Sequence, residues 1–230
     1  MSRNPTMKTK KTESTTDDNG HVNRAAAHLE AMETTEAIKA VVIKVPQLQI
    51  ETMKVKIIGD SPLICHRWSE KAKKQILGKQ LGEASPGREI KNPEQDYLDS
   101  LYPYPGGGYG FPTIAFKNAM VTACTSLGKS VTKVQARQAF HVMGELVKID
   151  GKPERREDMV RVGMGSADIR FRGEFKKWSC TLQIRFNARV LTRDQLVNML
   201  NTAGFAVGVG EWRSEKDGSY GLFTVEGLTR

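Results

Sequence analysis

Two segments of this chain alternate apolar and polar residues with the period of a β-strand that buries one face. From Trp178 to Phe186 every second residue is apolar and those between them are polar, and residues 48–57 show most of the same alternation. Successive side chains of a strand point to opposite faces of the sheet, so this period predicts strands with one face on a core and the other in solvent.

Helical segments separate the predicted strands. Ser69 is a candidate N-cap for a helix over residues 70–79, and Pro93 suits the start of a helix over 94–101. The other predicted elements are helices over 112–127, 134–140 and 192–202, the last ending at Gly204, and strands over 142–149, 158–163, 167–173 and 222–225. This order predicts an α+β fold: an RRM-like or ferredoxin-like antiparallel sheet with helices on one face, carrying insertions.

Residues 1–45 are predicted to be an N-terminal tail that is disordered or ordered by a partner. Residues 1–24 are rich in Ser, Thr, Asn, Asp and Lys, so they lack the apolar surface that would offset the entropy of ordering. Residues 25–39 favour helix but offer a thin apolar face, so a helix there needs a partner or a neighbouring subunit. Residues 46–230 are predicted to form one domain with inserted helices and a hairpin.

The chain is basic, and the excess charge lies in the predicted domain. Its formal net charge is +9. Residues 1–45 hold seven Lys and Arg against six Asp and Glu, whereas residues 46–230 hold 28 against 20. A basic folded surface attracts polyanions, including RNA, DNA and anionic lipid. A well-solvated surface without a ligand is the alternative interpretation.

Several classes of protein are excluded by the composition. No stretch approaches the roughly 18 apolar residues of a membrane helix, and the first 20 residues lack the apolar segment of a secretory signal. We therefore expect a cytoplasmic protein of a bacterial or phage-infected cell, with no membrane partner. Cys65, Cys124 and Cys180 have no CxxC spacing and are predicted to be free, buried thiols. The four histidines are scattered, so neither a metal nor another cofactor is expected.

The segment over residues 204–223 carries the most specific functional signal. Glycines permit close approach of another backbone, and the N–H groups of such a loop can bind a phosphate. Arginine and lysine add charge, and the aromatic rings offer faces on which bases stack. The residues predicted to contact nucleic acid are Gly208, Gly210, Trp212, Arg213, Lys216, Gly218, Tyr220 and Gly221. The alternative is a long turn whose glycines serve packing only.

Nucleotide-cofactor motifs do not fit this loop. A dinucleotide-binding GxGxxG follows a strand and opens a helix, whereas these glycines follow a predicted helix and lead to a strand. A P-loop needs a GK[ST] sequence, which does not follow here.

Two terminal segments resemble a known family. The pattern Gly208-x-Gly210, a variable basic stretch and Gly218-x-x-Gly221 followed by a hydrophobic residue resembles the C-terminal glycine-rich loop of the RAMP superfamily, the RNA-binding proteins of CRISPR systems. Residues 57–64 resemble the first strand and turn of that superfamily's backbone subunits. The resemblance implies an RRM-like core with insertions that assembles along a guide RNA, or a phage-encoded relative outside CRISPR. The chain is short for a backbone subunit.

Two further basic segments fit a groove around a strand, because phosphate contacts need cations without fixed spacing. The first comprises Arg67, Trp68, Lys71 and Lys74, and the second comprises Arg155, Arg156, Arg161, Arg170 and Arg172. The alternatives are a solvated helix face for the first segment and, for the second, a hairpin whose arginines pair with neighbouring acidic residues, Glu154, Glu157, Asp158 and Asp168.

These observations predict a non-catalytic protein that binds single-stranded RNA or DNA and coats it as a homo-oligomer or filament. A structural or assembly protein, viral in origin, is the first alternative. A metal-independent endoribonuclease is the second, with His66 as the candidate general base. An enzyme is not expected, because no neighbouring residue forms a recognisable catalytic dyad with His66 in the sequence.

Overall fold

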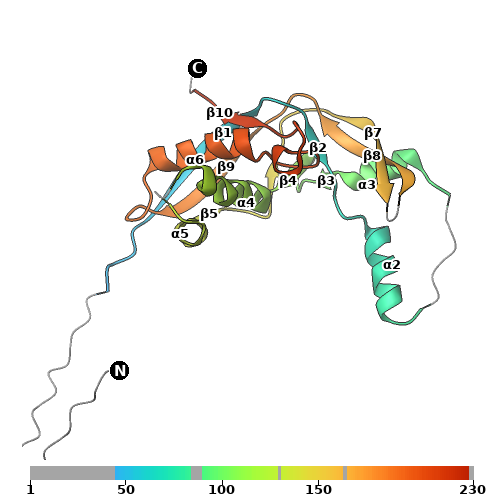
Figure 1. Ribbon diagram of the computed structural model, residues 1–230, viewed down its shortest axis with the longest axis horizontal. Coiled ribbons are helices and arrows are strands. Elements are labelled where there is room, and N and C mark those ends of the chain that lie inside the picture. Colours follow the sequence, from blue (N-terminus) through green and yellow to red (C-terminus); the bar gives the residue numbers. More distant parts are fainter. Residues whose placement is uncertain (1–44, 84–89, 129–130, 163–164, 228–230) are drawn as a thin grey trace, which may run out of the picture. The chain divides into compact units, whose positions relative to one another are not determined.

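The computed structural model describes residues 45–83, 90–128, 131–162 and 165–227 (Figure 1). The chain divides into two units, residues 1–46 and 47–230. The predictions for residues 1–44, including the helix over 25–39, lie outside the described residues. The second unit holds all the elements described below.

The core of this unit is a four-stranded antiparallel sheet in a β-α-β-β-α-β order. Its elements are β1 (Ile50–Gly59), α4 (Thr113–Ala123), β5 (Phe140–Val142), β9 (Ser179–Asn187), α6 (Arg193–Ala206) and β10 (Phe223–Val225). The strand order is β10-β1-β9-β5, with Ile57 opposite both Val225 and Cys180. This is the ferredoxin-like arrangement, so the predicted fold class is confirmed.

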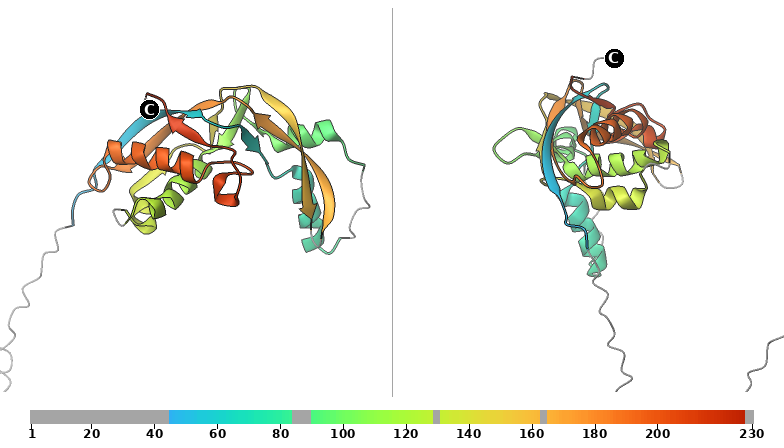
Figure 2. Two further views of the ribbon diagram at one scale, coloured as in Figure 1. Left: turned by 45° about the horizontal axis from the view of Figure 1, so that its top comes forward. Right: turned by 90° about the vertical axis from the view of Figure 1, so that its left-hand side faces the viewer.

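Helices α4 and α6 lie on one face of this sheet, as Figure 2 shows in its right-hand view. The alternation in the sequence explains this arrangement: Leu182, Ile184 and Phe186 of β9 are fully buried, and the residues between them are exposed. From α4 and α6, Phe116, Met120 and Leu200 complete the apolar core. The opposite face of the sheet is solvated.

Two insertions extend the ferredoxin-like core. The first, between β1 and α4, contains β2 (Leu63–Cys65), α2 (Glu70–Gln80), α3 (Pro93–Ser100), β3 (Tyr102–Pro103) and β4 (Tyr109–Pro112). The second, between β5 and β9, contains β6 (Leu146–Lys148), β7 (Pro153–Val162) and β8 (Ser166–Phe175). They form two three-stranded sheets, β2-β8-β7 and β3-β4-β6. The remaining elements are α5 (Lys133–Ala139), η1 (Cys124–Ser126) and η2 (Ser214–Lys216).

The structure differs from the sequence-based expectation at three places. The strand predicted over residues 142–149 is two strands, β5 and β6, because a turn with Gly144 at a positive φ separates them. The hairpin strands are longer than predicted, ten residues each. Helix α6 continues through Gly204 to Ala206, and Gly208 takes the left-handed conformation instead.

Gly204 lies inside α6 because the helix packs closely on β10. A Cβ at this position would lie 1.8 Å from the carbonyl oxygen of Phe223. We therefore expect Gly204→Ala to lower the free energy of unfolding by about 1 to 3 kcal/mol, as overpacking does in a tight core. Urea denaturation followed by circular dichroism measures this change.

Gly78→Ala is the matched control. Gly78 lies in α2, where a Cβ would meet only the flexible Glu83 side chain. This variant is expected to be neutral or stabilising by about 0.5 to 1 kcal/mol, because alanine favours helix over glycine. Equal stability of the Gly204→Ala variant and the wild type would contradict the packing described here.

Candidate nucleic-acid interface

Three hollows meet where the chain leaves β2. The first, of about 560 Å³, lies between α4 and the C-terminal loop, residues 207–222. The second, of about 680 Å³, lies between the start of α4, the β5–β6 turn and Trp68. Tyr102, Pro112 and Ile114 line both, so the two hollows adjoin, and we call them together the central groove. The third hollow, of about 150 Å³, adjoins it at residues 66–68.

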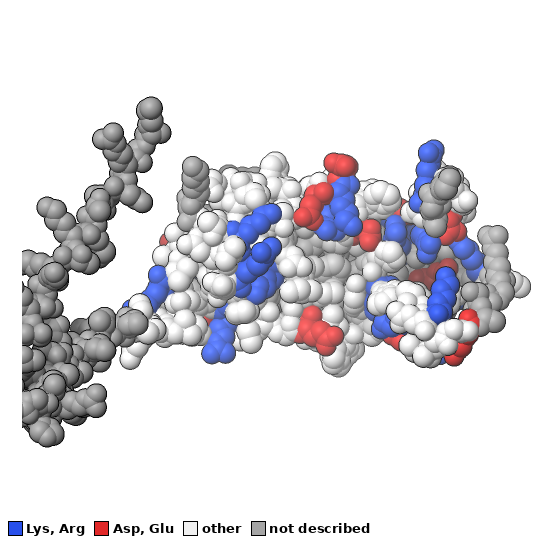
Figure 3. Space-filling model, turned by 60° about the horizontal axis from the view of Figure 1, so that its bottom comes forward, with Lys and Arg blue, Asp and Glu red and all other residues white. Residues whose placement is uncertain are grey.

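Cationic side chains from different elements line the central groove. Lys117 of α4 lies 3.1 Å from Nδ1 of His141 in β5, and Arg185 of β9 is directly opposite His141 in the sheet. Figure 3 shows Lys and Arg in both halves of this face, with few Asp and Glu beside them in the half that holds the core helices. The lining cations are Arg67, Lys73, Lys117, Arg137 and Arg213, and the lining carboxylates are Glu145, Glu211 and Glu215.

Helix α4 begins in the floor of the groove. Its N-cap is Pro112, which has no side chain that caps the first turn, and Thr113 donates its N–H to the Glu145 carbonyl at 3.0 Å. The unpaired N–H groups of a first helical turn and the helix dipole favour an anion at this end. The start of α4 therefore adds to the positive potential of the groove.

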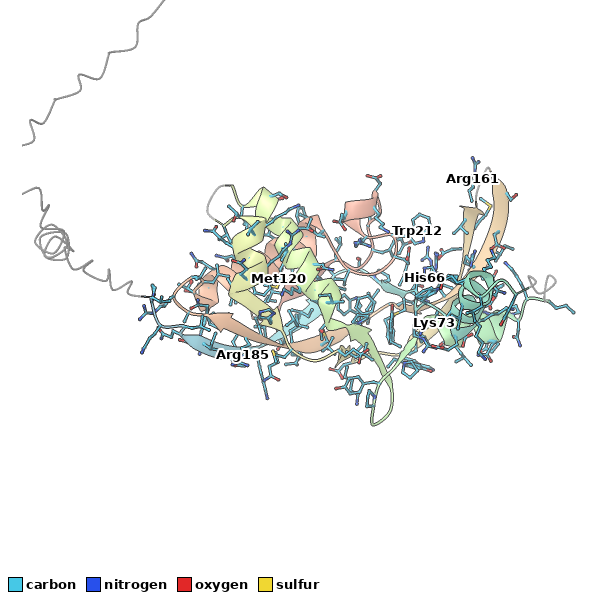
Figure 4. All side chains as sticks on the ribbon, turned by 90° about the horizontal axis from the view of Figure 1, so that it is seen from below. His66, Lys73, Met120, Arg161, Arg185 and Trp212 are labelled. Atoms are coloured by element: carbon cyan, nitrogen blue, oxygen red, sulfur yellow. The ribbon has the colours of Figure 1, made fainter. Side chains whose placement is uncertain are left out.

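Aromatic rings border the same groove. The Trp68 side chain is 56% exposed, although tryptophan is usually buried. Tyr102 donates its hydroxyl to the His66 carbonyl at 3.3 Å, and burial raises the pKa of this phenol. Figure 4 shows His66 and Trp212 between Met120 of α4 and Arg161 of the β7–β8 hairpin. Exposed rings beside cations are the arrangement on which unpaired bases stack.

His66 and Glu211 form a pair at the junction of the hollows. Nδ1 of His66 lies 3.0 Å from a carboxylate oxygen of Glu211. The hydrogen bond from His66 lowers the pKa of the Glu211 carboxyl. The sequence did not indicate this pair, because 145 residues separate its members.

The C-terminal loop uses most of its N–H groups within the protein. Gly208 donates to Ala203, Gly218 to Arg213 and Gly221 to Pro62. In the conformation described, the N–H groups of these three glycines are therefore not available to a phosphate, and contact of Gly210 with nucleic acid stays a prediction. A Cβ on Gly221 would lie 1.7 Å from the Val209 carbonyl oxygen. Gly210 likewise lies against β2, at the Ile64 carbonyl.

The charged and aromatic residues of this loop have mixed surroundings. Arg213 lines the groove but pairs with Glu215 at 2.7 Å and donates to the Gly210 carbonyl. Lys216 is exposed on η2, and Trp212 is 37% exposed with a φ of 54°, a strained value for a non-glycine residue. Tyr220 lies under the Arg156 guanidinium, 4.7 Å from ring centre to Cζ. Their contact with nucleic acid remains a prediction.

Most arginines of the β7–β8 hairpin pair with carboxylates, as the alternative interpretation held. Arg156 contacts Asp158 at 2.7 Å and Glu174 at 2.8 Å, and Arg172 contacts Asp158 at 3.0 Å. Burial alone would raise the pKa of Asp158, but the hydrogen bonds from both arginines outweigh it and lower the pKa. The other pairs are Arg155 with Glu94 and Glu157, and Arg170 with Asp168.

Arg172 is only 6% exposed, so the prediction that it lies on an open binding surface is wrong. Arg161 differs from the other hairpin arginines because it is exposed near the end of β7, and no residue in the described ranges pairs with it.

The first basic segment lies as predicted beside the groove. Ser69 caps α2 by accepting from the Ala72 N–H, and Arg67 and Trp68 line two of the three hollows. Lys71 and Lys74 are exposed on α2. Sequence reasoning missed Lys117, Arg137 and His141, because each is a single basic residue in an otherwise unremarkable helix or strand.

The remaining expectations concern metals, membranes and thiols. In the part of the chain that the structure describes, no group of three His, Cys, Asp or Glu residues is placed to hold a metal ion. None of the described helices is long and apolar enough to cross a membrane. All three cysteines are free and buried, as predicted, and burial raises the pKa of Cys65 to about 12.

Comparison with known proteins finds similarity only among solved structures. No family model and no curated protein matches the sequence. Cmr6 from Pyrococcus furiosus is 12% identical with a TM-score of 0.42, and the match covers 78% of this chain and all of that one. A chain of the Type III-B Cmr-beta bound to cognate target RNA is 10% identical with a TM-score of 0.39; the match covers 89% of this chain and 65% of that one.

At these identities and TM-scores, the two matches carry no conclusion about the function of this chain.

Proposed function

We propose that this protein binds single-stranded nucleic acid in the central groove without cutting it. The observation that carries the proposal is that Lys117, His141 and the exposed ring of Trp68 line one hollow at the start of α4, and Arg137 lines the adjoining one. Cations contact the phosphates of a strand, and planar rings stack on its bases. The resemblance of the terminal segments to RAMP proteins makes RNA the first strand to test.

The distribution of ion pairs supports the groove over the hairpin. The hairpin arginines of β7 and β8 are largely neutralised by neighbouring carboxylates. Lys117, by contrast, has no carboxylate partner among the described residues, and its Nζ donates to Nδ1 of His141 at 3.1 Å. The remaining N–H groups of the ammonium can contact a phosphate.

Assembly of several copies along one strand is part of the proposal. Exposed apolar side chains outside the core support it: Ile76 and Leu77 of α2, and Met159 and Ile169 of the hairpin. Sedimentation of complexes with oligonucleotides of increasing length measures the number of copies bound. If one copy of the protein binds to oligonucleotides of every length, assembly of several copies along one strand is contradicted.

Fluorescence anisotropy with a labelled single-stranded RNA tests the groove. We expect Lys117→Ala and Arg137→Ala each to weaken binding and to reduce the slope of log K against log salt by about 0.7, the value for one phosphate contact on a single strand. Trp68→Ala is expected to lose about 1 to 3 kcal/mol of binding free energy through lost stacking.

Arg193→Ala is the matched control, because Arg193 is an exposed arginine on α6 that pairs with Glu51 outside the groove. It should leave affinity and salt slope unchanged. If Arg193→Ala and Arg137→Ala change the affinity and the salt slope equally, the proposal that the strand binds in the central groove is contradicted. Absence of salt-dependent binding to any oligonucleotide would favour a structural or assembly protein instead.

One contact supports a second candidate function, metal-independent RNA cleavage. His66 is exposed at the groove, and Glu211 orients its ring by the 3.0 Å contact. A histidine held by a carboxylate is a suitable general base, which contributes about 10² to 10⁴-fold in rate. For a binding protein, prolonged incubation with end-labelled RNA leaves the strand intact. Cleavage that His66→Ala abolishes, with RNA affinity retained, would establish the enzyme instead.

A further inference from the structure

The third hollow is separate from the central groove and differs from it in charge. It lies between α2, α3 and β8, and Arg67 and Trp68 form its border with the groove. Its volume of about 150 Å³ is far more than the roughly 30 Å³ of a water molecule, and cavities of about this size hold one aromatic ring. The open hollow therefore suits one planar base at most, not a length of strand.

Arg172 lines this hollow with an unsatisfied hydrogen-bond donor. Its side chain is 7% exposed, and its Nη1 donates to Asp158 at 3.0 Å. Within the described ranges no atom accepts a hydrogen bond from its Nε, which is buried. A buried donor without an acceptor costs about 1 to 3 kcal/mol. Arg172 is among the residues that line the hollow, and we take this unpaired donor as the contact that an acceptor on a ligand would make.

Arg67 presents further donors at the border of the hollow. Its Nε donates to the Asp99 carbonyl at 3.1 Å, which restrains the guanidinium where Arg67 lines both the central groove and the third hollow. The rings of Trp68 and Phe171 also line the hollow. A planar ligand with acceptor atoms at its edge fits these donors and rings.

Two carboxylates of α3 supply acceptors in the same hollow. Asp99 accepts from Gln95 through one oxygen at 2.9 Å, and Asp96 has no side-chain partner among the described residues. The hollow holds charges of both signs: Lys91 and Arg170 share Asp168, Arg172 pairs with Asp158, and Asp96 and Asp99 add carboxylates. A neutral ligand with both acceptors and donors suits this mixture better than a phosphate does.

We propose that the third hollow binds one unstacked guanine base of the strand in the central groove. Guanine presents the acceptors O6 and N7 to arginine, the commonest specific arginine contact. It is also the one standard base with two neighbouring N–H donors, N1 and N2, that a single carboxylate accepts together. Arg172 and Arg67 bind the acceptor edge, Asp96 binds the donor edge, and Trp68 covers the ring.

This inference rests on the proposed function and gives it a point of sequence selectivity. Contacts to phosphates and ring faces tolerate any base. One base turned out of the strand into a side pocket adds discrimination at a single position, as it does in proteins that flip bases. The strand then lies in a fixed register relative to Trp68.

Competition anisotropy with uridine-rich RNAs that differ at one central position tests the pocket. Wild-type protein is expected to bind the guanosine RNA about 5- to 150-fold more tightly than the adenosine, cytidine or uridine RNAs, since a bidentate contact discriminates by about 1 to 3 kcal/mol. Inosine lacks the N2 amino group and 7-deazaguanosine lacks N7, so each is expected to lose most of the preference.

Asp96→Asn separates the pocket from the groove. In this variant the dissociation constants of the four RNAs should lie within about twofold of one another, because the guanosine RNA loses its advantage. The affinity for the uridine RNA should stay that of the wild type. Asp194→Asn is the matched control, an exposed aspartate in the first turn of α6, and should keep the guanosine preference. Thermal melting of both variants checks that folding is intact.

If the wild type binds all four RNAs with equal affinity, the proposal that the third hollow binds guanine is wrong. The proposed binding of the strand in the central groove is then unaffected. If no RNA binds, the proposed function fails, and titration of the four nucleoside monophosphates against intrinsic tryptophan fluorescence tests the pocket separately. Selective quenching by GMP that Asp96→Asn removes would then support the pocket alone. Equal or absent quenching by all four would overturn it.

Discussion

The attachment of the C-terminal loop to the first insertion is the interaction on which the site depends. Gly221 donates to the Pro62 carbonyl at 2.8 Å, and Glu211 donates its N–H to the Ile64 carbonyl at 3.1 Å. These bonds join residues near the two ends of the folded unit, and the Glu211 side chain adds the contact with His66. Without this attachment the groove would lose one wall, because residues 207–211 line it opposite α4.

The ferredoxin-like core supplies a rigid base for this arrangement. Helix α4 packs on α6 and the sheet through fully buried residues such as Phe116 and Met120, while its first turn opens into the groove. Binding residues held by packed helices and strands keep their geometry better than residues on free loops. Insertions surround this base and provide Trp68, Tyr102 and the third hollow.

Local sequence patterns predicted the elements well and the site only in part. The period of β9, the Ser69 cap and the position of the C-terminal loop depend on nearby residues, so the sequence reveals them. Lys117, His141 and Arg137 come together only when α4, α5 and β5 pack. The burial of Arg172 and its pairing with Asp158 depend on hairpin register and on packing against α3, which charge counting does not reveal.

Photo-crosslinking is the most direct test of the central claim that the groove, not the hairpin, holds the strand. A single-stranded RNA carrying 4-thiouridine is irradiated with the intact protein, and the crosslinked peptides are identified by mass spectrometry. The account predicts crosslinks in residues 66–73, 112–118 and 137–142, which line the groove. Crosslinks confined to residues 153–175 of the β7–β8 hairpin, or to the solvated face of the core sheet, would contradict it.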